Sequence, residues 1–248
     1  MRQIVWRVLN VGYATQESQR IREPHSALPA EPKARLASRL KPLSLVVPAV
    51  VAEAGSEVQH IYFPQNCVLS TLAVSESGHA VETATIGREG AFGLVAAMNG
   101  HETYARCVVQ HSGAAYRIAA ADFKKEFDRS AHVRAIVMGY IEALLIQVQQ
   151  SVLCNALHPV ESRLSRWLLL MQDRADTDTL PLTQEFLAGM LGVNRTTVTS
   201  AARHLQSVGL ISYRRGVVHI RKRAALEDAS CECYRIARSH YQRLLAAP

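Results

Sequence analysis

The sequence predicts an α+β fold in which an antiparallel β-roll, similar to a cupin jelly roll, is followed by one long helix and a small C-terminal helical domain closed by a β-hairpin. Three observations predict this order: short β-branched runs in the first half, a long helical period in the middle, and two short helices before a basic hairpin. A chain of 248 residues is long enough for two modest domains.

The first half of the chain carries short strand-like runs. Between residues 44 and 118, turn residues separate the runs HIYFP, CVLSTLAV, AVETATIG, YARCVVQ and AAYRIA. Several short strands at this spacing are typical of a sandwich or barrel. The Gly-rich segment GREGAFGLVAAM interrupts them and predicts a loop with a short helical turn. We therefore expect residues 27–128 to form the β-roll and residues 1–26 to form a poorly ordered N-terminal extension.

A long helix is predicted over residues 129–157, where the apolar period becomes helical. Its apolar residues form two stripes. The first, spaced 4-3-4 as in a coiled coil, comprises Val137, Ile141, Leu144 and Val148. The second comprises Val133, Ile136, Tyr140 and Ala143. One stripe can pack on the β-roll, and the first is predicted to be the dimerisation seam with the same helix of a second subunit. A helix buried within one chain is the alternative.

Residues 158–248 predict a separate domain. Pro159 ends the long helix and suits the first position of the next one, whose sequence VESRLSRWLLLMQ has one apolar face. A polar loop, DRADTDTLP, follows. Two short helices come next: Thr183 caps the first, Gly192 ends it in a left-handed conformation, and Asn194 caps the second.

The second short helix has one apolar and one polar side. The apolar stripe comprises Val198, Ala202, Leu205 and Val208. The polar side has no carboxylate and comprises Arg195, Thr196, Thr197, Thr199, Ser200 and Arg203. A helix-turn-helix presents such a face to the DNA major groove, where Arg binds guanine and Thr or Ser reaches bases and phosphates.

The segment LISYRRGVVHIRKR predicts a β-hairpin after these helices, with Arg214 and Arg215 at its tip, as in the wing of a winged helix. Between Asn194 and Arg223 the chain has seven Lys or Arg residues and no acid. Protein surfaces normally mix the two signs, so this span suits phosphates. The predicted partner is double-stranded DNA, and Thr183 and Asn194 are further candidate contacts. A generic helical hairpin with a solvated polar face is the alternative.

The segment LTQEFLAGMLGVNRTTVTSAARHLQSVGLISYRRG resembles the DNA-binding end of the Crp/Fnr transcription regulators. HIYFPQNCVLSTLAV, TIGREGAFGL and SCECY resemble a bacterial branch of that family, so the resemblance extends over residues 27–234. It implies a cyclic-nucleotide-binding-like sensor, a homodimer that binds an inverted-repeat operator, and contact with RNA polymerase. It also implies that Arg195 reads a guanine, whereas Thr196 and Ser200 replace a Glu and an Arg of the family, which predicts a different operator.

The resemblance also bears on the effector. The family's cyclic-nucleotide pocket has a G-E pair and an R-[ST]-A motif, and this chain has Gly90-Ala91 and Arg106-Cys107 instead. We therefore expect an effector other than cyclic AMP. Gly90, Ala91 and Arg106 are the candidate effector residues, and an exposed strand arginine is the alternative interpretation of Arg106.

Cysteine and acid patterns predict no metal, no cofactor and no catalytic residues. The five cysteines are scattered, and none precedes Cys67, which disfavours the iron–sulfur branch of the family. The one-residue spacing of Cys231-Glu-Cys233 is unusual for zinc. We expect these two thiols to pack a C-terminal helix on the wing, and a redox role is the alternative. Glu82 and Glu89 are expected to be solvated.

The sequence thus predicts a regulator that is not an enzyme. The competing class is a small-molecule-binding or enzymatic β-barrel whose C-terminal half serves assembly only. The net charge of +7 is a weak indication of an anionic partner. Because no apolar run of membrane-spanning length and no leader cleavage site was recognised, a cytoplasmic location is expected.

Overall fold

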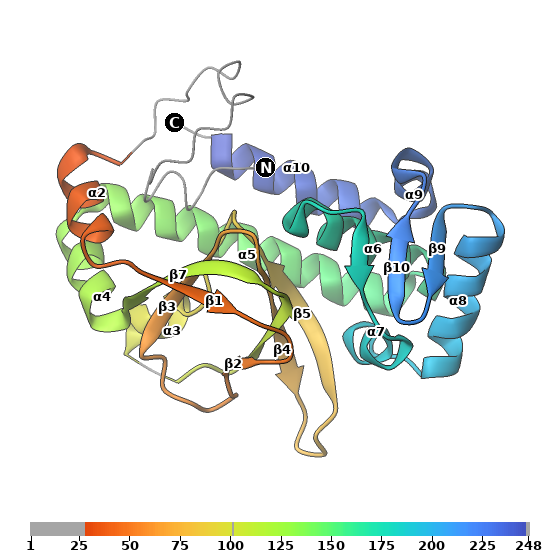
Figure 1. Cartoon of the computed structure of the whole chain (residues 1–248). Coiled ribbons are helices and arrows are strands. Elements are labelled where there is room, and N and C mark those ends of the chain that lie inside the picture. The colour runs from red at the N-terminus through yellow and green to blue at the C-terminus, as the bar shows by residue number, and fades with distance from the viewer. Residues whose placement is uncertain (1–27, 101, 247–248) are drawn as a thin grey trace.

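The computed structural model describes residues 28–100 and 102–246, so the predicted extension over residues 1–26 lies outside the described residues. One long helix, α5, runs along the whole molecule (Figure 1). The strands of the first half lie on one side of α5 toward one end, and the C-terminal helices and hairpin lie at the other end. The predicted α+β order is confirmed.

Among the described residues, seven strands form the β-roll, and every pairing between them is antiparallel. One sheet has the order β1-β7-β3 and the other β2-β6-β4-β5. The strands are β1 Lys41–Leu45, β2 Val50–Ala52, β3 His60–Pro64, β4 Val68–Val74, β5 Ala80–Ile86, β6 Arg106–His111 and β7 Gly113–Ala119. The first two are largely exposed edge strands, so they lack the apolar runs that identify the other five in the sequence.

Three helices cover the β-roll: α2 Ala30–Ala37, α3 Leu94–Asn99 and α4 Ala120–Arg129. The short helix α3 follows the Gly-rich loop, as predicted. Helix α2 was not predicted, because it buries only Pro32 and Leu36. Arg35 fixes it to α4 through an ion pair with Glu126, in which Nη2 lies 2.7 Å from Oε1.

Helix α5 spans Ala131–Leu157 and begins at Ser130, whose hydroxyl accepts a hydrogen bond from the Val133 amide. Its predicted second stripe is buried against the β-roll at Val133, Tyr140 and Ala143. By length and composition, α5 is the one helix among the described residues that could cross a membrane. The core helix of a soluble protein passes the same test, and α5 packs on the β-roll here.

The predicted dimerisation seam needs a correction. Val137 is only 2% exposed and lies in the core that α5 forms with its own β-roll, because it follows Val133 by one helical turn. Ile141, Leu144 and Val148 are half-buried. The apolar side chains that α5 leaves exposed are instead Met138, Leu145, Val152, Leu153 and Leu157.

Helix α6, Val160–Ala175, begins after Pro159, which is its N-cap rather than its first residue. It is buried on nearly every side, and not on the single face predicted, because it packs between the β-roll, the other C-terminal helices and the strand Thr179–Pro181. The predicted polar loop contains a strand, β8 Thr179–Pro181, which pairs with the hairpin in a sheet of order β8-β10-β9.

Helices α9, Arg223–Ala229, and α10, Glu232–Ala246, complete the chain. The sequence predicted that the C-terminal helix lies on the wing. Instead, α10 runs beside α5, and its Tyr241 joins the buried cluster that contains Tyr140 (Figure 1). The C-terminal helix therefore connects the helical domain to the β-roll side of the molecule.

A buried polar network joins the β-roll to the C-terminal domain. Arg174 of α6 lies with its Nε 2.7 Å from Oε1 of Glu89, in the Gly-rich loop, and both side chains are 3% exposed. Arg174 also donates to Gln147 of α5, which donates to the Thr85 carbonyl. The expectation of a solvated Glu89 was wrong, because this loop faces α6 and not solvent.

Glu82 was also expected to be solvated, and it too bridges the domains. Its carboxylate accepts hydrogen bonds from Ser70 and from the Trp167 indole of α6, at 2.5 and 2.9 Å. Burial raises the pKa of this carboxyl group. Two acids of the β-roll thus hold α6 in place.

We predict that Glu89→Gln lowers the free energy of unfolding by about 3–5 kcal/mol, because it leaves the Arg174 charge buried without a counter-charge. Urea denaturation followed by circular dichroism measures this. Glu53→Gln is the matched control, since Glu53 pairs with Arg106 at the surface and such pairs contribute less than about 1 kcal/mol. Equal losses in the two variants would contradict the role given to Glu89.

Candidate nucleic-acid interface

The predicted helix-turn-helix is present as α7, Gln184–Leu191, and α8, Arg195–Ser207. The Thr183 hydroxyl accepts a hydrogen bond from the Phe186 amide and so caps α7, as predicted. Gly192 ends α7 with φ +60°, the left-handed conformation that glycine adopts easily. Asn194 occupies the cap position of α8, but its side chain makes no capping hydrogen bond, which corrects that part of the prediction.

The buried side of α8 consists of Val198, Ala201, Ala202 and Leu205. Val208 was expected there, yet it is 50% exposed because the helix has ended by that point. Ala201, which was not part of the predicted stripe, is buried on this side instead. Small residues at 201 and 202 allow α6 to approach α8 closely, and this contact fixes the orientation of the outward face.

The outward face of α8 presents most of the predicted side chains. Five of them are exposed and lie on α8 itself: Arg195, Thr196, Thr197, Ser200 and Arg203. Thr199 differs, because it is half-buried and its hydroxyl oxygen lies 2.7 Å from Gln184 Oε1 and 2.9 Å from the Arg195 carbonyl oxygen. Thr199 therefore supports the contact between α7 and α8.

The predicted wing is the hairpin of β9, Ile211–Arg214, and β10, Val217–Ile220. Its two-residue turn is Arg215-Gly216, and both residues have positive φ, as a type I′ turn requires. The Gly216 carbonyl accepts a hydrogen bond from the Leu182 amide, and the Tyr213 hydroxyl donates to the Leu182 carbonyl. These bonds hold the exposed Arg214 and Arg215 side chains beside the start of α7.

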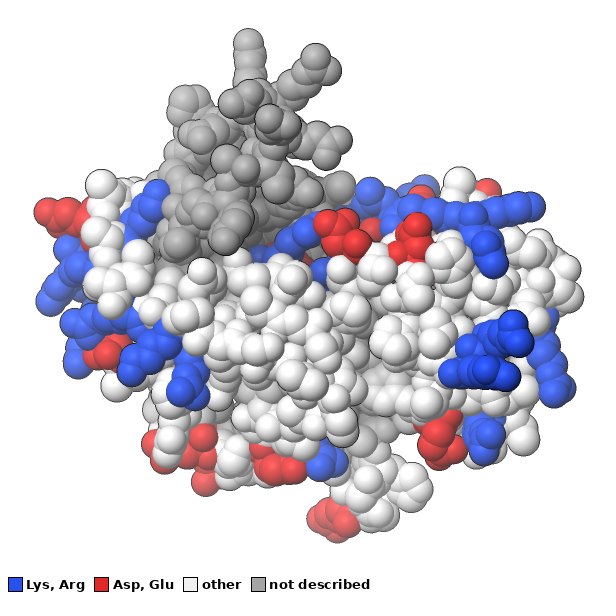
Figure 2. Space-filling view, in the orientation of Figure 1, with Lys and Arg blue, Asp and Glu red and all other residues white. Residues whose placement is uncertain are grey.

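Positive charge gathers on this end of the molecule. Figure 2 shows Lys and Arg side chains where Figure 1 places α8 and the hairpin. Six of the seven basic residues in the acid-free span are exposed: Arg195, Arg203, Arg214, Arg215, Arg221 and Lys222. The geometry thus combines a protruding polar helix with flanking basic residues, which is the arrangement that binds a base edge and phosphates together.

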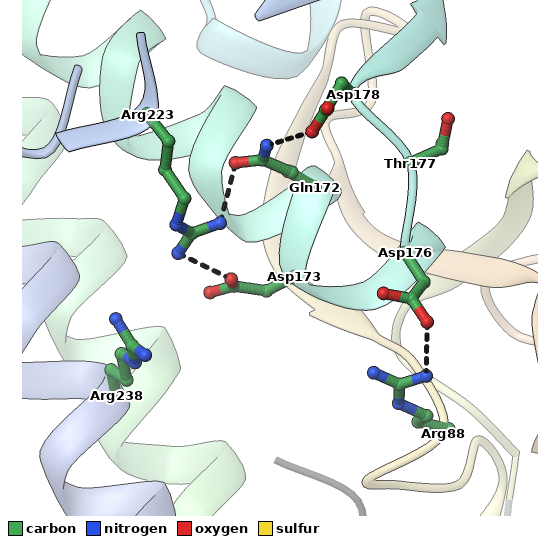
Figure 3. A pocket seen from close by; sticks show the side chains of 8 residues that line it. All are labelled: Arg88, Gln172, Asp173, Asp176, Thr177, Asp178, Arg223 and Arg238. Atoms are coloured by element: carbon green, nitrogen blue, oxygen red, sulfur yellow. Dashed lines mark hydrogen bonds and ion pairs between the residues drawn. The ribbon is translucent and has the colours of Figure 1, made fainter. Parts of the chain in front are cut away.

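Arg223 is the exception among the seven. It points toward the end of α6, where its Nη2 lies 2.7 Å from Asp173 Oδ1 and its Nη1 donates to Gln172 (Figure 3). A polar pocket of about 330 Å³ lies there, and Arg88 and Asp176 form a second ion pair at its edge. Arg223 therefore fastens α9 to α6, and the prediction that it belongs to the phosphate-binding set was wrong.

A separate cavity of about 300 Å³ lies between the β-roll and α5. Its lining is mainly apolar, and Ala91, Tyr140 and Leu144 contribute to it. Of the three candidate effector residues, Ala91 alone lines this cavity. A Cβ atom on Gly90 would lie 2.6 Å from the Tyr140 ring, and Arg106 lies outside, paired with Glu53.

The sequence of residues 162–229 matches the family model of the Crp-like helix-turn-helix domain. No curated protein matches the chain. Among solved structures, FixK2 from Bradyrhizobium japonicum has a TM-score of 0.66 at 15% identity, and covers 77% of this chain and 98% of its own. A putative Crp/Fnr-family transcriptional regulator from Eubacterium rectale has a TM-score of 0.66 at 19% identity, with 82% and 94% covered.

A third solved structure is the c-di-GMP-responsive regulator CLP of Xanthomonas campestris, with a TM-score of 0.63 at 14% identity. It covers 76% of this chain and 97% of its own. The matched domain, the polar face of α8 and the basic hairpin define a DNA-binding transcription regulator. With the β-roll and the long helix before that domain, the chain has the same overall fold as these solved structures, which agrees with the resemblance to the Crp/Fnr regulators found in the sequence.

We predict different effects for the two basic groups of the interface. Arg195→Ala should cost about 1–3 kcal/mol on the preferred site and relax preference at one base position, because an arginine at this place reads a base edge. Arg214→Ala should weaken binding to every duplex and lower the salt slope by about 1, as expected for a phosphate contact. Fluorescence anisotropy on matched and shuffled duplexes at several salt concentrations measures both. Uniform loss from Arg195→Ala would contradict its assignment.

Proposed function

We propose that the chain acts as a homodimer whose two α8 helices enter successive major grooves of an inverted-repeat operator. The observation that carries this proposal is the exposed polar face of α8 beside an exposed basic hairpin. A dimer with a two-fold axis places its half-sites about one helical turn apart, roughly 34 Å. In this proposal, base contacts come from Arg195, Thr196, Thr197 and Ser200 of α8, and phosphate contacts come from Arg203, Arg214 and Arg215.

The exposed apolar side chains of α5 support the dimer. Met138, Leu145 and Val152 follow one another at seven-residue intervals and are 57%, 54% and 66% exposed. The half-buried Ile141 and Val148 fall between them, which gives the 3-4-3-4 spacing of a coiled coil. A continuous apolar stripe of this kind is unfavourable in water, and a second α5 would cover it. The proposed seam keeps Ile141 and Val148 from the sequence prediction and replaces Val137 and Leu144.

The cavity beside α5 is the proposed effector site. It is lined on one side by three residues of α5, Tyr140, Leu144 and Val148. A molecule bound in the cavity would therefore contact the helix that is proposed to join the subunits. No Lys or Arg is among the described residues that line it, whereas Glu102 is. A cyclic phosphate would meet no counter-charge there and would face a carboxylate. We infer that the effector is not cyclic AMP, and that an uncharged or largely apolar molecule fits the lining better.

A signal would reach the DNA-binding domain through the contacts of the Gly-rich loop. Within this loop, Ala91 lines the cavity and Glu89 pairs with Arg174 of α6. The Ala91 carbonyl also accepts a hydrogen bond from Tyr140 of α5. A ligand that binds one arrangement of this loop more tightly would shift the orientation of α6 and with it α8.

No observation on the described residues favours an enzymatic β-barrel. Contact with RNA polymerase and a cytoplasmic location remain part of this proposal.

We predict that Leu145→Glu converts the dimer to a monomer, because it places a charge in the middle of the apolar seam. Loss of the paired half-site contact should reduce operator affinity by about 10²–10⁴-fold. Sedimentation velocity and anisotropy measure the two effects. His132→Glu is the control, since it adds the same charge to α5 at an exposed position off the seam. Leu145→Glu protein that stays dimeric would sink the proposed seam.

We predict that isothermal titration calorimetry detects no cyclic AMP binding at micromolar concentration, because the cavity offers no basic side chain to the phosphate. The full-length protein is titrated at two temperatures, so that a small binding enthalpy at one of them does not hide an interaction. Saturable binding with micromolar affinity would overturn the inference about the effector.

A further inference from the structure

Four potential metal ligands meet where α5 ends and α10 begins. The ligand atoms of Cys154, His158, Cys231 and Cys233 all lie within 4.8 Å of one another. The three cysteines are buried, and His158 is half-buried. No metal ligand was predicted from the sequence, because the Cys231-Glu-Cys233 pair has an unusual spacing for zinc by itself. Its partners are distant in the chain, with Cys154 77 residues before Cys231.

The local structure holds each pair on one helix end. Cys154 lies in the last turn of α5, and His158 is the residue that follows this helix, so the helix end brings both side chains to the cluster. Cys231 precedes α10, and Cys233 lies in its first turn. The positive end of the α10 dipole points at the cluster and favours thiolates there.

The distances suit a tetrahedral ion. Zinc with Zn–S bonds near 2.3 Å and Zn–N bonds near 2.0 Å needs two sulfurs about 3.8 Å apart, and sulfur and nitrogen about 3.5 Å apart. Here Cys154 Sγ and Cys231 Sγ lie 3.4 Å apart, and Cys233 Sγ and His158 Nδ1 lie 3.5 Å apart. His158 Nε2 lies 3.2 Å from Glu232 Oε1, which is the carboxylate–histidine contact that orients a metal-bound imidazole.

Two buried arginines beside the cluster provide an independent observation. Arg166 is 5% exposed, and its Nε has no hydrogen-bond partner among the residues that the structure describes, although the Glu82 carboxylate lies near enough to interact with its charge. Arg163 is 6% exposed and bonds only to neutral acceptors, Asn155 and the Leu191 carbonyl. A buried guanidinium is costly without a counter-charge, and neutral thiols supply none. Three thiolates around a divalent ion carry a net negative charge, which would compensate the arginines.

We propose that Cys154, His158, Cys231 and Cys233 form a structural Cys₃His site for Zn²⁺. The ion displaces the three thiol protons, which pass to the solvent, and binds neutral His158 through Nδ1, so no redox step is involved. Four protein ligands close the site to substrate, as in other structural zinc sites. The ion fastens α10 to α5 directly before Pro159, where the DNA-binding domain begins, and so fixes the junction between the two domains. This site does not depend on the proposed function.

The first test is the metal content of the full-length protein, purified without chelators and without a histidine tag. Inductively coupled plasma mass spectrometry should find about one zinc ion per chain. Exchange with Co²⁺ should produce the intense visible absorption of tetrahedral cobalt thiolate, together with a sulfur-to-cobalt charge-transfer band. Protein with no zinc and no such cobalt spectrum would overturn the proposal, as would a Cys154–Cys231 disulfide in its place, detected by intact-mass analysis.

Variants test which residues bind the ion. Cys154→Ala and Cys233→Ala should lose both the zinc and the cobalt spectrum. Cys107→Ala should keep both, because Cys107 is equally buried but lies in the β-roll. His158→Cys should retain zinc as a Cys₄ site, whereas His158→Ala should lose it, and this pair separates ligation from packing. Equal zinc content in Cys154→Ala and Cys107→Ala would contradict the assignment. Circular dichroism of each variant shows whether it has folded.

Discussion

The buried ion pair between Glu89 and Arg174 is the interaction on which the arrangement of the two domains depends. It joins the Gly-rich loop of the β-roll to α6, and Gln147 of α5 completes the network. Neither charge has access to water, so each must keep the other as a partner. The loop, the long helix and the DNA-binding domain therefore cannot move independently. A movement of the β-roll loop must therefore move α6 as well, or the ion pair must break.

Helix α5 has three sides with different surroundings. Val133, Tyr140 and Ala143 face the β-roll, α10 lies along another side, and the Met138, Leu145 and Val152 stripe remains exposed. Because two sides of α5 are covered within the chain, the exposed stripe is the side left for the proposed second subunit. The proposed zinc site would hold the C-terminal end of this helix against α10. The orientation of α6 would then be fixed both by the Gly-rich loop and by this junction.

The sequence predicted the order of the domains, five of the seven β-roll strands and the helix-turn-helix, because periodicity, turn residues and helix caps are local signals. It did not predict β1, β2 or α2, which bury few side chains. It also missed the roles of Glu89, Arg223 and the cysteine cluster, because each depends on a partner far along the chain. A Cys-x-x-x-His pair on a helix end was the available signal for the cluster. Val137 was assigned to the wrong side of α5 because two apolar stripes on one helix do not reveal which partner each one meets.

The proposed function requires a dimer that recognises a specific DNA sequence without an added ligand. Selection of binding sites from a random duplex library, with purified full-length protein and no added ligand, tests it most directly. A dimer of this kind should enrich one inverted repeat whose half-sites are centred about 10 base pairs apart. Absence of any DNA binding, even at low salt, would contradict it.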